Sequence, residues 1–374
     1  MDNESIKIGV LFSQTGGMAV TENAHIQGIL LACEEINHSG GIDGRNLEPI
    51  IFNPEGDDRQ YAKMATELLL KHGVSTIFGC CLSTSRKAVV PIVERFNGIL
   101  FYPSVYEGFE YSPNVIYGGA VPNQMILPLL EYIYRNHGKK IALIGSDTLY
   151  AREINRIVAE FIAGSDGVLV SETYITFGTS SRTIETMLRQ HVDEEVDVVL
   201  STVVGDDSIA LYTAYANSDF MKAKTPIASL TTTESEMAKI NSTDRAGHLS
   251  VAPYFSSLNT PASKFFVAAF NKKFGKKEIP GIYSEVSYSL THVYANAVRL
   301  CGTTETDDIL SALSGAVFKA PGGNRFVDIG TNHFALRPLI AKSKTDGTFE
   351  IVWEGTSAIR ADPYLVAYDR SINE

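Results

Sequence analysis

IKIGVLFSQTGG (residues 6–17) decides the fold, because an apolar, β-rich run of seven residues ends there in a small polar loop. The apolar residues that follow recur with the spacing of one helix face: Ile26, Ile29, Leu30, Cys33 and Ile36. Ser39-Gly40-Gly41 ends this pattern, and a second apolar run occupies residues 47–52. Strand, helix and strand in this order predict a βαβ unit with a parallel sheet.

The same alternation continues along the chain. Further strands are predicted at 74–80, 99–102, 140–145, 168–174, 196–203, 227–230 and 249–254, with helices at 61–72, 86–96, 151–163, 262–274 and 283–301. Asp346-Gly347 lies between two short apolar runs and indicates a tight hairpin near the C-terminus. The pattern predicts two doubly wound α/β lobes with return crossings between them.

Composition excludes several classes of protein. The 374 residues include 43 acidic and 32 basic side chains, a net charge of −11, which argues against direct nucleic-acid binding. No apolar run approaches the roughly 18 residues of a membrane-spanning helix. The four cysteines form no CxxC pair, so neither a disulfide framework nor a zinc site is expected. The start Met1-Asp2-Asn3-Glu4 has no leader character, which favours the cytoplasm unless a leader was removed from an exported protein.

Catalytic and cofactor motifs are not found. The sequence has no P-loop and no GxSxG elbow, and Gly40–Gly44 follows a helix and is a turn. The eight histidines are scattered without metal-ligand spacing, and no cofactor is expected. Cys80-Cys81 at a strand end has two interpretations: a nucleophile, or two small residues that pack at the sheet edge. Packing is favoured, because no local motif supplies a histidine.

Neutral hydroxyl and aromatic residues follow five predicted strands at their carboxyl ends: CLSTS (81–85), YPSVY (102–106), SDTLY (146–150), STVVG (201–205) and TTTE (231–234). Ligands of open α/β sheets bind at this edge, and hydroxyl groups suit a small neutral polar ligand such as an amide. Helix capping is the alternative for single residues such as Ser83 and Thr231. Five clusters at equivalent positions favour a ligand cleft.

Several long segments resemble a known family: FGCCLSTSRKAVVPIVE (78–94), LFYPSVYEGFEYSPNVIYGGAVPNQ (100–124), STVVG (201–205), IASLTTTESEMAKI (227–240) and VAPYFSSLNTPASKFF (251–266). They resemble the short-chain amide and urea group of periplasmic-binding-protein-like proteins, over residues 6–364. The resemblance implies the type I fold: two doubly wound lobes joined by three crossings, with a ligand cleft between them. It places residues 1–120 and 252–325 in one lobe, and 121–251 and 326–374 in the other.

The family's cleft residues transfer to individual positions of this sequence. The resemblance assigns ligand contacts to Ser83, Tyr102, Ser104, Tyr150, Val204 and Thr231. Two positions depart from the family pattern, because Cys81 and Thr148 stand where relatives usually carry aromatic residues. We expect the smaller side chains to widen the cleft and favour an amide longer than acetamide. Arg86, Lys87 and the acids of YEGFE are interpreted as structural ion pairs or surface charge.

The function implied by the resemblance is that of a cytoplasmic regulator, not an enzyme. Such a protein binds a small aliphatic amide or a urea-like ligand and controls an RNA-binding transcription antiterminator, as in amidase operons. The alternative is a periplasmic receptor that delivers urea or amides to an ABC permease. A third interpretation, from a different class, is an amide hydrolase that uses Cys81. A homo-oligomer is compatible with the first two.

Overall fold

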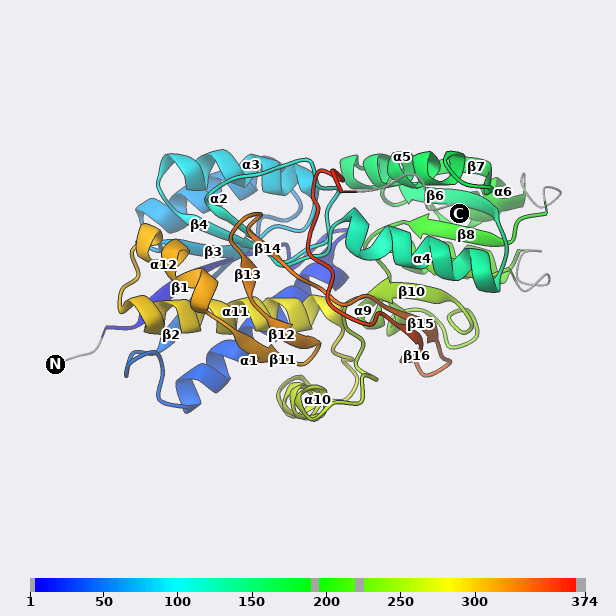
Figure 1. The fold of residues 1–374 in the computed structure, drawn as a ribbon. Helices are drawn as coiled ribbons and strands as arrows, with labels where there is room; N and C mark the ends of the chain where they lie inside the picture. The colour runs from blue at the N-terminus through cyan, green and yellow to red at the C-terminus, as the bar shows by residue number, and fades with distance from the viewer. Residues whose placement is uncertain (1–3, 190–194, 219–224, 368–374) are drawn as a thin grey trace.

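The computed structural model describes residues 4–189, 195–218 and 225–367. Figure 1 shows two lobes side by side, each built on a twisted sheet with helices on both faces. The first sheet has the order β13 (Val327–Asp328), β14 (His333–Phe334), β5 (Val115–Tyr117), β4 (Ile99–Tyr102), β3 (Thr76–Gly79), β1 (Ile6–Leu11) and β2 (Leu47–Phe52). Only the β13–β14 pair is antiparallel in this sheet.

The second sheet repeats this arrangement. Its order is β16 (Phe349–Glu354), β15 (Leu339–Ser343), β10 (Leu249–Ala252), β9 (Ile227–Ser229), β8 (Val198–Thr202), β6 (Lys140–Ser146) and β7 (Val168–Ile175). The strands from β7 to β10 are parallel, and β15 and β16 form the predicted hairpin around Asp346-Gly347. The prediction of two doubly wound lobes is therefore confirmed.

Helices cover both sheets. The helices that pack with the first sheet or its connections are α1 (Ala19–His38), α2 (Asp58–Leu70), α3 (Ser83–Arg95), α10 (Pro261–Phe274), α11 (Ile282–Cys301) and α12 (Thr306–Ala312), followed by the 3₁₀ turn Leu313–Gly315. Those of the second lobe are α4 (Pro122–Asn136), α5 (Leu149–Ala163), α6 (Ser181–Arg189), α7 (Asp207–Ala216) and α9 (Glu234–Met237). A small antiparallel pair, β11 (Phe318–Ala320) and β12 (Gly323–Arg325), lies beside α11.

The apolar residues of the first helix form one buried face, as predicted. Ile26, Ile29, Cys33 and Ile36 are all buried, and α1 packs along α11. The alternating apolar strands likewise place Ile8 and Val10 in the core. Burial of such side chains is the main source of stability of each lobe.

The chain crosses between the lobes three times, at residues 118–121, 253–260 and 335–338. The last crossing differs from the predicted boundary at 325/326. His333 of β14 pairs in parallel with Tyr117 of β5, so β13 and β14 belong to the first lobe. After β16 the chain runs back along the boundary between the lobes, where Leu336 pairs with Ile359 (Figure 1).

Candidate ligand-binding site between the lobes

A small cavity lies where the lobes face each other, at the carboxyl ends of their parallel strands. Its volume is about 30 Å³, roughly that of two water-sized spheres. The first lobe supplies Met18, Thr21, Cys81, Leu82, Ser104, Val105 and Tyr283 to its wall, and the second supplies Thr148, Tyr150, Val204, Gly205 and Thr231. All twelve side chains are uncharged, so the wall suits a neutral ligand.

Six of the eight predicted site residues meet at this cavity: Cys81, Ser104, Thr148, Tyr150, Val204 and Thr231. Ser83 and Tyr102 do not line it. Both are buried behind the wall, where the Tyr102 hydroxyl donates to the backbone oxygen of Cys81 at 2.7 Å. A direct ligand contact of Ser83 or Tyr102 therefore stays a prediction, and it requires a small shift of the wall.

Sequence reasoning missed Met18, Thr21, Leu82, Val105, Gly205 and Tyr283. Leu82, Val105 and Gly205 lie inside the clusters that follow the strands, so their place at strand ends could have identified them as site residues. Tyr283 lies in the first turn of α11, far along the chain, and no local pattern marks it. Met18, Leu82, Val105 and Tyr283 are bulky and line a cavity of only about 30 Å³, and the expected widening relative to relatives with aromatic residues at the positions of Cys81 and Thr148 stays a prediction.

Several hydroxyl groups of the cavity wall donate hydrogen bonds to other groups of the protein. Thr231 Oγ1 donates to the backbone oxygen of Val203 at 2.6 Å. Thr21 Oγ1 donates to a carboxylate oxygen of Glu236 at 2.7 Å, and the Tyr283 hydroxyl donates to the backbone oxygen of Thr231. A hydroxyl has one hydrogen, so these groups can offer a ligand only their lone pairs. These three hydroxyl groups can accept hydrogen bonds from ligand N–H or O–H groups.

Two residues at the start of α5 have the complementary character. The Tyr150 hydroxyl is buried and has no hydrogen-bond partner among the described residues. Burial raises the pKa of Tyr150, so its hydroxyl keeps its proton. Thr148 caps α5 by accepting from the backbone N–H of Ala151 at 3.2 Å, which leaves its own hydrogen available. Both side chains can donate to a ligand oxygen.

The lobes also touch each other directly around the cavity. The backbone N–H of Asp206 donates to the backbone oxygen of Gly17 at 2.8 Å. Gly205 stands beside this bond with a φ of +61°, and a Cβ atom there would lie 2.1 Å from the same oxygen. Together with the Thr21–Glu236 and Tyr283–Thr231 bonds, this contact holds the lobes closed around the cavity.

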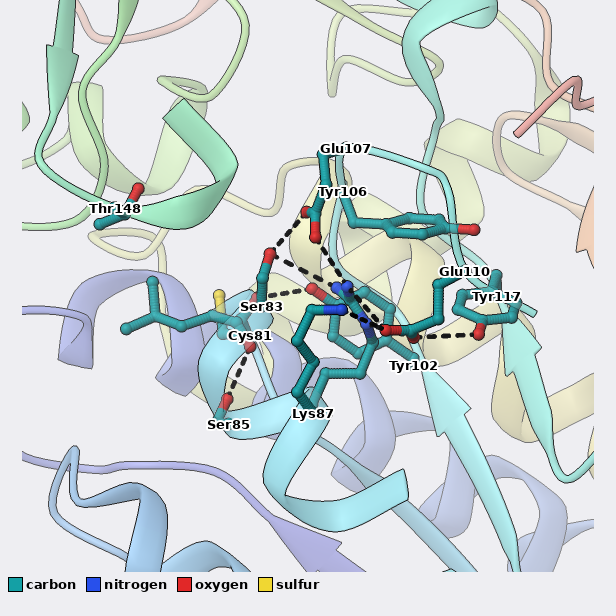
Figure 2. A network of polar contacts seen from close by, with 12 residues as sticks. Cys81, Ser83, Ser85, Lys87, Tyr102, Tyr106, Glu107, Glu110, Tyr117 and Thr148 are labelled. Carbon is teal, nitrogen blue, oxygen red and sulfur yellow. Dashed lines mark hydrogen bonds and ion pairs between the residues drawn. The ribbon is translucent and has the colours of Figure 1, made fainter. Parts of the chain in front are cut away.

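A buried charged network lies behind the first lobe's wall (Figure 2). Arg86 is fully buried and pairs with Glu107 at 2.9 Å and Glu110 at 2.8 Å. Its guanidinium also lies over the rings of Tyr102 and Tyr106, 4.9 and 4.6 Å from their centroids. Lys87 pairs with Glu110 at 3.1 Å. The interpretation of these charges as structural ion pairs is confirmed.

The cysteines at the end of β3 are unsuited to nucleophilic chemistry. Cys80 and Cys81 are both buried, and burial raises the pKa of each thiol well above its usual value. A nucleophile needs the thiolate, which such an environment disfavours. Within residues 4–189, 195–218 and 225–367 no cluster of three or more potential metal ligands occurs, and no helix is long and apolar enough to span a membrane.

Two α/β lobes that close on a small neutral cavity define the class of bilobed ligand-binding proteins. The chain belongs to the periplasmic binding protein domain family, whose model matches residues 6–370, and its fold is the type I periplasmic-binding-protein fold.

Full-length relatives of the chain are binding proteins. The leucine-, isoleucine-, valine-, threonine- and alanine-binding protein of Pseudomonas aeruginosa is 21% identical over 350 residues, which cover 87% of this chain and 86% of that protein. A solute-binding protein of an ABC transporter from Rhodopseudomonas palustris, in complex with 3,4-dihydroxybenzoic acid, superposes with a TM-score of 0.86 at 19% identity, over 96% of this chain and 99% of that one.

A further similarity is local. A limonene hydroxylase of Geobacillus stearothermophilus is 31% identical over 121 residues, which are 32% of this chain and 22% of that protein. The chain thus matches less than a quarter of that relative's length.

Proposed function

We propose that the protein is a solute-binding protein that holds a small neutral amide or urea between its lobes and makes or breaks no bond. The binding-protein relatives support the general class. The amide-like ligand is supported by the residues of this chain alone.

The observation that carries the proposal is which hydroxyl groups of the cavity wall can donate a hydrogen bond to a ligand and which can only accept one. Tyr150 and Thr148 can offer hydrogens, and Thr21, Thr231 and Tyr283 can offer lone pairs. A primary amide or urea carries both a carbonyl oxygen and N–H groups. Such a ligand can use both kinds of hydroxyl group without a charged partner.

The ligands of the relatives fit this cavity less well. An amino acid needs partners for its ammonium and carboxylate groups, and a dihydroxybenzoate needs room for a ring. The cavity wall has no charged side chain. The cavity volume of about 30 Å³ is far below the roughly 300 Å³ or more of a typical ligand pocket. The small volume favours urea or acetamide, in contrast to the longer amide expected from the sequence.

Isothermal titration with a panel of ligands tests this proposal. Urea, acetamide, propionamide and butyramide would be compared with leucine and 3,4-dihydroxybenzoate. We expect urea or acetamide to bind most tightly, with no ammonia released after prolonged incubation. Tighter binding of leucine or dihydroxybenzoate would contradict the ligand assignment, and ammonia release abolished by Cys81→Ala would contradict the non-catalytic class.

Two roles remain for such a binding protein, and the relatives favour one of them. The Rhodopseudomonas palustris protein is named as a solute-binding protein of an ABC transporter, which supports delivery to an ABC permease outside the cytoplasm. The regulator that controls an antiterminator, in the cytoplasm, is supported only by the sequence segments quoted above. Cell fractionation with a specific antibody separates the two roles, since the receptor is exported and the regulator is not. A neighbouring permease gene supports the first, and neighbouring amidase and antiterminator genes support the second.

A further inference from the structure

We propose that Glu107 is a positioning residue that makes the site prefer an amide to the corresponding carboxylate, by turning Ser83 into an obligate hydrogen-bond acceptor. This inference rests on the proposed function and on the predicted contact of Ser83 with the ligand, because Ser83 is buried next to the cavity wall and does not line it. It concerns the discrimination between two ligands of nearly equal size and shape, such as acetamide and acetate.

The first step is the hydrogen of Ser83. Ser83 Oγ donates to one carboxylate oxygen of Glu107 at 2.6 Å, and both residues are about 4% exposed (Figure 2). A serine has a single hydroxyl hydrogen, and Ser83 Oγ also accepts a long hydrogen bond from Nη1 of Arg86 at 3.5 Å, so its remaining capacity toward a ligand is the acceptance of one further hydrogen bond. The N–H of an amide can use that capacity. A carboxylate oxygen cannot, because it would face a lone pair.

The second step is what holds Glu107 in place. Its other carboxylate oxygen pairs with Arg86 at 2.9 Å, and Arg86 is fixed in turn by Glu110. The next residue, Gly108, has a φ of +82°, and a Cβ atom there would lie 2.3 Å from the backbone oxygen of Pro363. The backbone N–H of Phe109 donates to that same oxygen at 2.8 Å. The Glu107 carboxylate is therefore held by residues of α3, and the backbone that follows Glu107 is held by the C-terminal segment at the lobe boundary.

The third step is the balance of charge. Arg86 and Lys87 face Glu107 and Glu110, so the network has two cations and two carboxylates. The charge of Glu107 also reaches the cavity wall, where it contributes to the raised pKa of Tyr150. Without this carboxylate, the network would carry one uncompensated positive charge and Ser83 would regain a free hydrogen. Both changes would favour an anionic ligand.

The test compares the affinities of acetamide and acetate in the full chain, in a buffer free of acetate. Glu107→Gln keeps the shape and removes the charge. Because Arg86 can only donate, the amide oxygen of the variant should face Arg86 and its NH₂ group should face Ser83, which can then no longer donate to residue 107. We expect the ratio of acetamide affinity to acetate affinity to fall about 10-fold or more, the size of effect typical of a hydrogen bond to a charged group. A purely structural role would lower both affinities together and leave the ratio unchanged.

Glu110→Gln is the matched control, because Glu110 pairs with Arg86 and Lys87 but has no contact with Ser83. It should leave the ratio within about 3-fold of the native value, a difference below 1 kcal/mol. An equal change in both variants would overturn the role of Ser83, since charge alone would then explain the result. If Glu107→Gln does not fold, Ser83→Ala replaces it, and should weaken acetamide binding without weakening acetate binding.

The failures can be told apart. A native protein that binds neither acetamide nor urea refutes the proposed function, and the inference falls with it. A native protein that binds acetamide, with an unchanged ratio in Glu107→Gln, refutes the inference alone.

Discussion

Tyr150 carries a buried hydroxyl without a hydrogen-bond partner among the described residues. An unpaired buried polar group costs about 1–3 kcal/mol, so Tyr150→Phe should leave the ligand-free protein as stable or more stable. The same variant should bind acetamide about 5- to 150-fold more weakly, because the ligand loses a donor. Thermal melts and titration calorimetry measure the two effects.

Tyr102→Phe provides the comparison, because the Tyr102 hydroxyl already donates to the Cys81 backbone oxygen. Here we expect a loss of stability and a smaller loss of affinity. If both variants lower stability to the same degree, the Tyr150 hydroxyl is not free in the unliganded protein.

Glu234 leads to a prediction about pH. Burial raises the pKa of Glu234 to about 7, although Ser256 donates two hydrogen bonds to it. Between pH 4.5 and 7 the folded protein therefore holds a proton that the unfolded chain releases, so this residue's contribution to stability falls as pH rises through that window. Glu234→Gln removes the contribution, and its melting temperature relative to the native protein should be higher at pH 8 than at pH 5. A pH-independent difference would contradict the raised pKa.

The site was predictable at the residue scale only where local sequence determines position. Cys81, Ser104, Thr148, Tyr150, Val204 and Thr231 follow recognisable strands, and strand ends of a parallel sheet converge. Tyr283 reaches the cavity through tertiary packing alone. Ser83 and Glu107 are separated by 24 residues in the sequence, and only the structure shows that Ser83 donates a hydrogen bond to Glu107.

At the scale of elements, the loops after β1 and β8 meet through Gly17 and Gly205. Gly205→Ala should hold these loops apart, because its Cβ atom would overlap the Gly17 oxygen. We expect ligand affinity to fall about 10-fold or more, a loss of at least 1.4 kcal/mol of closure energy, as measured by titration calorimetry.

Gly178→Ala controls for backbone strain. Gly178 has a φ of +80° in the same lobe, but a Cβ atom there would have no neighbour within 4 Å. Both variants should lose about 1 kcal/mol of stability, since alanine is disfavoured at positive φ, and only Gly205→Ala should lose affinity. Equal affinity losses would mean that strain, not lobe contact, explains the result.

Most elements could be predicted from apolar periodicity, because each helix and strand buries one pattern of side chains. The true position of the last lobe boundary, which was predicted at 325/326, could not be found in this way. β13 and β14 are two residues long each, too short to show alternation, and the pairing of His333 with Tyr117 depends on the completed first sheet.

At the scale of the whole molecule, the inter-lobe hydrogen bonds indicate a closed arrangement that a ligand should stabilise. A ligand that contacts both lobes shifts the balance only by its differential affinity for the closed state. We expect small-angle scattering to show a smaller radius of gyration with saturating acetamide than without it. The native protein and Gly205→Ala should be measured together, because the variant should remain expanded. An identical radius for the native protein with and without ligand would argue against hinge closure.

The three crossings also govern how the protein is made. The first sheet begins at Ile6 but receives its edge strands β14 and β13 only from residues 327–334, and the second receives β15 and β16 from residues 339–354. A ribosome that has synthesised 320 or so residues therefore carries two sheets with open edges at β5 and β10, which are sites for pairing with other chains. The first sheet receives its last strand by residue 334 and the second by residue 354, so both are completed late in translation. We expect the nascent chain to need protection from aggregation until these strands have emerged.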